Sequence, residues 1–148
     1  KDIYSCSWDD KRMLRWDAST GTIKKQYYNA TAPVTSMALD PSGKWLACIT
    51  ENKVLIMQSS DFRIQKEIAV PGASLVQFDE QGKRIYITSA EYSKEKLFIY
   101  TLASSELKAS VNLIYSPVSC VIKGSTVLVY NYEELVLINL LTGTHSRG

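Results

Sequence analysis

Residues that usually build metal and cofactor sites are scarce in this sequence. It has one histidine, His145, and three cysteines in 148 residues. Cys6, Cys48 and Cys120 lie far apart, without a CxxC pair or a neighbouring histidine, so the spacing excludes the common zinc motifs. No G-x-G-x-x-G or P-loop pattern is present, and the seven glycines lie mostly in turn-like segments. We therefore expect no metal and no cofactor.

The sequence also lacks a strong excess of charge and a long apolar run. A formal net charge of +2 is too small to indicate a nucleic-acid partner. No apolar stretch approaches the length that a membrane-spanning helix needs, so the pattern predicts no such segment. Asn29-Ala30-Thr31 matches the glycosylation acceptor pattern, which leaves a secreted origin open. Scattered free cysteines favour an intracellular location, cytoplasmic or nuclear.

A tight-turn signature recurs along the chain and reveals a repeat. Asp40-Pro41-Ser42-Gly43 returns as Asp79-Glu80-Gln81-Gly82, and Gly124 follows after a similar interval. Short apolar segments precede each of these turns, at Val34 to Leu39, Leu75 to Phe78 and Val118 to Ile122. Others follow them, at Trp45 to Thr50, Ile85 to Ser89 and Thr126 to Tyr130. This order predicts a series of β-hairpins.

A further strand in each unit is expected from a nearly continuous apolar run. These runs are Met13 to Trp16, Val54 to Met57, Leu97 to Tyr100 and Leu135 to Leu141. Equivalent positions in them recur at the interval of roughly 40 residues that is typical of a propeller blade. Segments such as Leu107 to Leu113 then alternate apolar and polar residues, which is typical of a strand with one wet face. The unit is therefore a four-stranded antiparallel blade whose fourth strand lies outermost.

The fold class predicted from this repeat is all-β, a β-propeller of four-stranded antiparallel blades. About three and a half blades are expected, namely a partial blade over 1–29, blades over 33–70 and 74–113, and a partial blade over 117–148. The first begins at its second strand and the last ends at its third. Because a propeller needs at least about four blades to close, we expect further blades from the same or another chain, in a larger propeller of seven-bladed type.

One segment resembles a WD repeat. It runs from Ser5-Cys6-Ser7-Trp8-Asp9-Asp10 through Trp16-Asp17 to Thr20-Gly21. In that family a tryptophan, a turn aspartate and a second-strand hydroxyl share a buried hydrogen-bond network, usually completed by a histidine. The resemblance implies these roles for Trp16, for Asp10 or Asp9, and for Ser7 or Ser5, but no histidine matches. Other residues replace the Trp-Asp pair in the later units, so a divergent propeller of another repeat family is an alternative.

Loops between second and third strands are expected on the same rim as the connections between blades. Tyrosine and arginine are the usual anchors of protein interfaces. The candidate partner-binding residues on this rim are Lys11, Arg12, Tyr28, Asn29, Tyr92, Tyr115 and Tyr132. Adjacent acids such as Glu133-Glu134 point to opposite faces and suit turn capping better than acid–base catalysis. His145, near the C-terminus, is expected in a surface loop.

The function expected from these features is that of a non-catalytic scaffold in an intracellular multiprotein complex, binding peptides or other subunits through the propeller rim. One alternative is a nucleic-acid-associated scaffold in RNA processing or ribosome assembly. It depends on a basic group formed by Lys11, Arg12, Arg15, Lys24 and Lys25, with which acidic residues are interleaved. The other alternative is a propeller enzyme, such as a lactonase-like hydrolase, with its site in blades outside this sequence.

Overall fold

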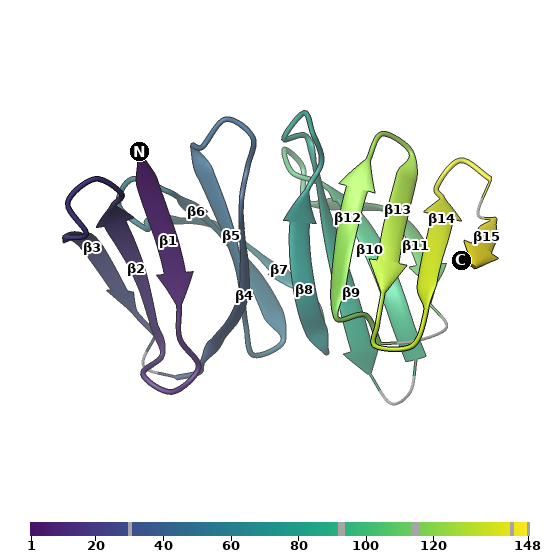
Figure 1. Cartoon of the computed structure of the whole chain (residues 1–148), viewed down its shortest axis with the longest axis horizontal. Helices are drawn as coiled ribbons and strands as arrows, with labels where there is room; N and C mark the ends of the chain where they lie inside the picture. Colours follow the sequence, from purple (N-terminus) through teal and green to yellow (C-terminus); the bar gives the residue numbers. More distant parts are fainter. Residues whose placement is uncertain (30, 92–93, 114–115, 143, 148) are drawn as a thin grey trace.

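The computed structural model describes residues 1–29, 31–91, 94–113, 116–142 and 144–147. Within them the chain forms four antiparallel sheets that stand side by side in chain order (Figure 1). Among the described residues no helix is long and apolar enough to cross a membrane. The all-β prediction of four-stranded antiparallel blades is confirmed.

Each sheet is a meander in which strands consecutive in sequence are neighbours in space. The first sheet contains β1 (Asp2–Cys6), β2 (Arg12–Asp17) and β3 (Ile23–Tyr28). The second contains β4 (Val34–Leu39), β5 (Trp45–Thr50), β6 (Lys53–Gln58) and β7 (Ile64–Ala69). The third contains β8 (Ala73–Phe78), β9 (Arg84–Glu91), β10 (Lys94–Thr101) and β11 (Glu106–Asn112). The fourth contains β12 (Ser119–Lys123), β13 (Thr126–Tyr130), β14 (Leu135–Asn139) and β15 (His145–Arg147).

The last sheet differs from its prediction. The expectation that the chain ends at a third strand is wrong, because β15 pairs with β14 and places His145 opposite Ile138. His145 accordingly lies in a strand and not in a surface loop. No local pattern marked β15, because all three of its residues are polar and exposed and show no apolar alternation.

The recurring Asp-to-Gly turns form through the same side-chain contacts in two sheets. Asp40 Oδ1 accepts the backbone N–H of Trp45 at 2.7 Å, and Asp79 Oδ1 accepts that of Arg84, at the equivalent position, at 3.1 Å. Gly43 then adopts a φ of 72°, in the left-handed region that glycine enters without a Cβ penalty. This local chemistry explains why the turn signature marked the hairpins.

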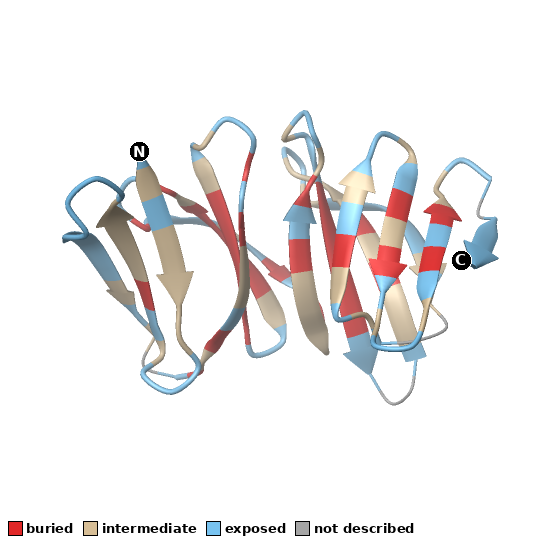
Figure 2. Cartoon of the chain, in the orientation of Figure 1, coloured by how far each residue is buried: buried red, intermediate tan, exposed pale blue. Residues whose placement is uncertain are grey.

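Three apolar clusters hold the sheets together, one at each junction between neighbours (Figure 2). The cluster between the second and third sheets includes Ile49, Ile56 and Ile87, all at most 2% exposed. Strands β5 and β9 are buried along most of their length because sheets cover both of their faces. The core of this protein therefore lies between blades rather than inside one sheet.

The two terminal sheets each keep one face uncovered by any described residue. In the fourth sheet Val121, Leu128 and Leu137 form one cross-strand row on that face, and Val121 is 56% exposed. Strand β14 alternates buried and exposed residues, whereas the equivalent strand β6 is buried at its four central positions. The nearly continuous apolar run of the third strand is thus buried on both faces in β6, which lies between two neighbouring sheets, but not in β14. The outer strand β11 is more exposed than its pattern indicated, with Leu107 at 47%.

Candidate functional site

The strand order gives the stack two different rims. Turns β1–β2, β5–β6 and β13–β14 and the described parts of the connections between sheets lie along one edge, at the bottom of Figure 1, which we call the connection rim. The opposite edge, here the hairpin rim, carries the β2–β3, β4–β5, β6–β7, β8–β9, β10–β11, β12–β13 and β14–β15 turns. The loops that were expected to share a rim therefore do so wherever the structure describes them.

The candidate residues on the connection rim are largely solvent-accessible. The Arg12 side chain is 47% exposed and lies 4.0 Å from the Asp10 carboxylate. Tyr28 is 57% exposed, and Lys11 has a positive φ of 56° in the β1–β2 turn. Tyr92 and Tyr115 lie outside the described residues, so their candidacy stays a prediction.

Asn29 has a structural role in the connection between the first two sheets. Its side-chain amide donates to Thr50 Oγ1 at 2.6 Å, and its Oδ1 accepts the Thr31 hydroxyl at 2.9 Å. These bonds tie the end of β3 to the end of β5. Asn29 therefore positions the rim and has less capacity left for a partner than its neighbours.

Tyr132 is displayed at the tip of a fixed turn. Asn131 Oδ1 accepts the backbone N–H groups of Glu133 and Glu134, at 2.8 and 2.7 Å. This arrangement, an Asx-type turn, leaves the Tyr132 side chain 93% exposed. A large aromatic side chain held away from the protein on a rigid turn is well suited to contact a partner.

Trp8 also lies on this rim, although it was not among the residues predicted to bind a partner. It lies in the β1–β2 turn and is 65% exposed. It borders a hollow whose other walls include Pro33, Glu51 and Ala73, so residues from the first three sheets surround one depression. Trp8 could have been recognised from the sequence, because it is a tryptophan in an expected turn and lies outside the apolar alternation of any expected strand.

The residues of the WD-repeat resemblance are only partly brought together. The Trp16 indole Nε1–H donates to Ser5 Oγ at 2.9 Å, so Ser5, the alternative to Ser7, is its partner. Ser7 lies after the end of β1 and is paired through its backbone N–H with the carbonyl of Arg12. Asp10 accepts the Arg12 backbone N–H at 3.3 Å within its own turn.

Most of the basic group is spread over the first sheet, and two of its members are neutralised there. Arg15 Nε donates to Asp2 Oδ2 at 2.7 Å, and Lys24 Nζ contacts Asp2 and Asp17 at 2.7 and 3.0 Å. These hydrogen bonds hold the pKa of both aspartates below the ordinary value, with the Ser19 hydroxyl as the largest influence on Asp17. These contacts between Asp2, Arg15, Asp17 and Lys24 join β1, β2 and β3.

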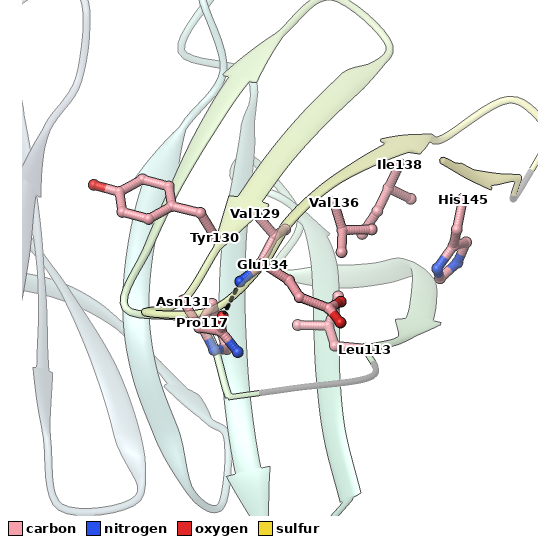
Figure 3. Close-up of a pocket in the computed structure, with 9 residues that line it drawn as sticks. All are labelled: Leu113, Pro117, Val129, Tyr130, Asn131, Glu134, Val136, Ile138 and His145. Atoms are coloured by element: carbon pink, nitrogen blue, oxygen red, sulfur yellow. Dashed lines mark hydrogen bonds between the residues drawn. The ribbon is translucent and has the colours of Figure 1, made fainter. Parts of the chain in front are cut away.

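A small apolar pocket under the connection rim holds one carboxylate and one imidazole (Figure 3). Glu134 and His145 project into it between Leu113, Val136 and Ile138. Glu134 Oε2 is buried and has no hydrogen-bond partner among the described residues, while Oε1 lies 3.8 Å from an Arg147 nitrogen. In the described part of the chain no three His, Cys, Asp or Glu side chains gather closely enough to hold a metal ion.

Comparison with known proteins supports the fold. No protein-family model matches the sequence, and no curated protein matches it. Structures similar to this chain include hydrazine synthase of Kuenenia stuttgartiensis, with a TM-score of 0.83, 15% identity, and coverage of 99% of this chain and 46% of that one. Two others are U3-55K and the WD40 repeats of RRP9, each with a TM-score of 0.81, 12% identity, and coverage of 99% of this chain and 47% of theirs.

These similarities define the class of protein. The chain has the fold of β-propeller blades, and its structural neighbours include WD40-repeat proteins. It spans about half the length of these solved chains. At 12–15% identity the likeness shows the fold alone, and propellers carry many unrelated activities.

Proposed function

We propose that this chain is a divergent WD-repeat propeller segment that acts as a non-catalytic scaffold and binds peptides or protein subunits through its connection rim. The observation that carries the proposal is Trp8, which is 65% exposed beside a hollow formed by the first three sheets. Exposed tryptophans next to concave surfaces are frequent anchors of protein interfaces. The proposed setting is a multiprotein complex inside the cell.

The rim combines aromatic anchors with positions that are held rigid. Trp8 and Tyr132 are exposed on fixed turns, and Arg12 and Tyr28 lie beside the Trp8 turn at the paired ends of β2 and β3. Because fixed turns and strand ends hold these side chains, less conformational entropy is lost when a partner binds. The interblade clusters keep the loops of successive sheets in register, so one partner can contact several blades at once.

The proposal is tested by capture of partners with matched variants. The chain is immobilised, cell lysate is applied with and without nuclease, and retained proteins are quantified by mass spectrometry. Trp8→Ala should lose specific partners that the chain retains. Leu141→Ala changes an 83% exposed residue on the opposite rim and should retain them.

Two results would contradict the proposal. Retention of the same partners by Trp8→Ala and by a Trp8→Ala, Tyr132→Ala double variant would remove the rim from the interface. Loss of all partners after nuclease treatment would instead favour the nucleic-acid-associated alternative.

A further inference from the structure

The hairpin rim carries a groove at the junction of the second and third sheets. Its apolar lining comes from Trp45, Ile56 and Leu102, and its polar lining includes Gln65, Lys66 and Lys83. Trp45 and Leu102 are partly buried against the cluster between these sheets, which leaves part of each side chain facing the groove. The groove is therefore a hollow with an apolar floor on the rim opposite to Trp8.

Hydrogen bonds between the two sheets fix the shape of this groove. Lys66 Nζ donates to the carbonyl oxygen of Leu102 at 2.7 Å and also to that of Ala103. These bonds fasten β7 of the second sheet to the β10–β11 turn of the third. The groove is consequently preformed, and binding there costs little ordering of the protein.

The charged side chains that line the groove are all basic. Its lining includes Lys66 and Lys83 and no carboxylate, and Lys44 Nζ lies 5.3 Å from the centre of the Trp45 ring. Within the described residues no Asp or Glu is within ion-pair distance of these three lysines. An adjoining groove, which shares Lys83 and Thr101, also contains Asp79 and Glu80. Asp79 is already engaged in capping the β8–β9 turn.

We propose that this groove is a second binding site, which takes a short linear segment of a partner protein with a bulky apolar side chain beside Asp or Glu residues. The apolar side chain occupies the floor over Trp45 and Leu102, where it displaces water from apolar surface. The neighbouring carboxylates meet the ammonium groups of Lys44 and Lys83, which supply electrostatic complementarity. Since the two rims face opposite ways, such a scaffold can hold one partner on each rim.

The test uses a phage-displayed library of random linear peptides selected against the intact chain. The expected peptides carry a large apolar residue next to Asp or Glu. Nuclear magnetic resonance then follows the indole N–H signals of the three tryptophans during titration with a selected peptide. The Trp45 signal should shift while that of Trp8, on the other rim, stays in place.

Variants with exposed substitutions separate binding from folding. Lys83→Glu reverses a lining charge, and Gln65→Trp fills the groove from the exposed strand β7. Each should weaken peptide binding by about tenfold or more, as the loss of an anchoring contact does. Lys25→Glu, an equal charge change on β3, is the matched control and should bind like the unchanged chain.

The proposal is overturned if the library yields no peptide, if the enriched peptides lack acidic residues, or if Lys83→Glu and Gln65→Trp bind as the unchanged chain does. A peptide that shifts the Trp8 signal instead would assign its binding to the connection rim. Because Trp8→Ala leaves the groove intact, loss of binding in that variant would likewise contradict a site on the hairpin rim. Thermal unfolding of each variant verifies that it is folded.

Discussion

Trp16 and Ser5 form a 2.9 Å hydrogen bond on the face of the first sheet that no described sheet covers. Their orientation follows from strand alternation. Tyr4 and Cys6 of β1 and Met13 of β2 belong to the cluster against the second sheet, so Ser5 and Trp16 point the other way. The hydrogen bond that the WD-repeat resemblance implied is thus present, but in a partly buried setting.

Removing this hydrogen bond should destabilise the chain to a modest extent. Ser5→Ala should lower the free energy of unfolding by about 1 kcal/mol, the usual net value of such a bond. Trp16→Ala should lower it by about 2 kcal/mol, less than the roughly 3–5 kcal/mol expected for a fully buried tryptophan, because part of the Trp16 side chain stays exposed to solvent. Urea unfolding measures both, with Ser7→Ala as the control. An equal or larger loss for Ser7→Ala would show that Ser7 is the partner in solution.

Acid should destabilise the first sheet in particular. Ion pairs and hydrogen bonds lower the pKa of Asp2 and Asp17 from the ordinary value of 3.8. A carboxylate with a lowered folded-state pKa stabilises the protein above the unfolded-state pKa, and this stability is lost as the pH falls below it. The melting temperature should therefore decrease below about pH 4. Asp17→Asn should melt lower at neutral pH and show a flatter acid dependence. An unchanged slope would exclude Asp17 as a contributor.

Gly72 should be intolerant of any side chain. Its φ is 68°, and an added Cβ would lie 2.7 Å from the carbonyl oxygen of Ala90. Gly72→Ala therefore combines backbone strain with a steric clash and should cost about 2–3 kcal/mol. Gly43→Ala has a similar φ of 72°, but no described atom beyond the two chain neighbours lies within 4 Å of the added Cβ, so about 1 kcal/mol is expected. If chemical denaturation shows equal losses of unfolding free energy for Gly72→Ala and Gly43→Ala, the clash with Ala90 is excluded.

The three cysteines should differ in reactivity in the folded protein. Burial raises the pKa of Cys48 to about 12 and that of Cys120 to about 11. Since the thiolate is the nucleophile, these thiols should resist maleimide at neutral pH. Cys6 is only partly buried and should be labelled first. Mass spectrometry should find early labelling at Cys6 alone, and labelling of all three cysteines in urea. Early labelling of Cys48 would contradict the packing of the first two sheets.

The uncovered face of the fourth sheet should promote association of the isolated chain. Val121 and Leu137 are 56% and 41% exposed within one apolar row, and exposed apolar surface of this kind favours self-association. Light scattering should show a mass that rises with concentration, and Val121→Lys with Leu137→Lys should reduce it. Lys25→Glu serves as a surface-charge control. A concentration-independent monomer would contradict this interpretation of the face.

Much of the fold follows from local sequence pattern. Val34 to Leu39, Trp45 to Thr50 and Thr126 to Tyr130 were predicted with the bounds that the structure shows. Apolar runs and Asp-to-Gly turns act within a few residues, so they can be recognised without knowledge of the neighbours. Strand β15 was not predicted, because its pairing with β14 is made by backbone groups and does not require particular residue types.

The sequence by itself determined the strands, the turns, the period of the repeat and the rim on which each loop lies, because all of these follow from local pattern and chain order. The tertiary structure decided which side chains share a surface. Ser5 rather than Ser7 meets Trp16 because of the register of β1 against β2. Trp8 borders a hollow, and Trp45 faces a groove, only because neighbouring sheets supply the other walls. Such sites join residues far apart in the chain, and the packing of blades alone brings them together.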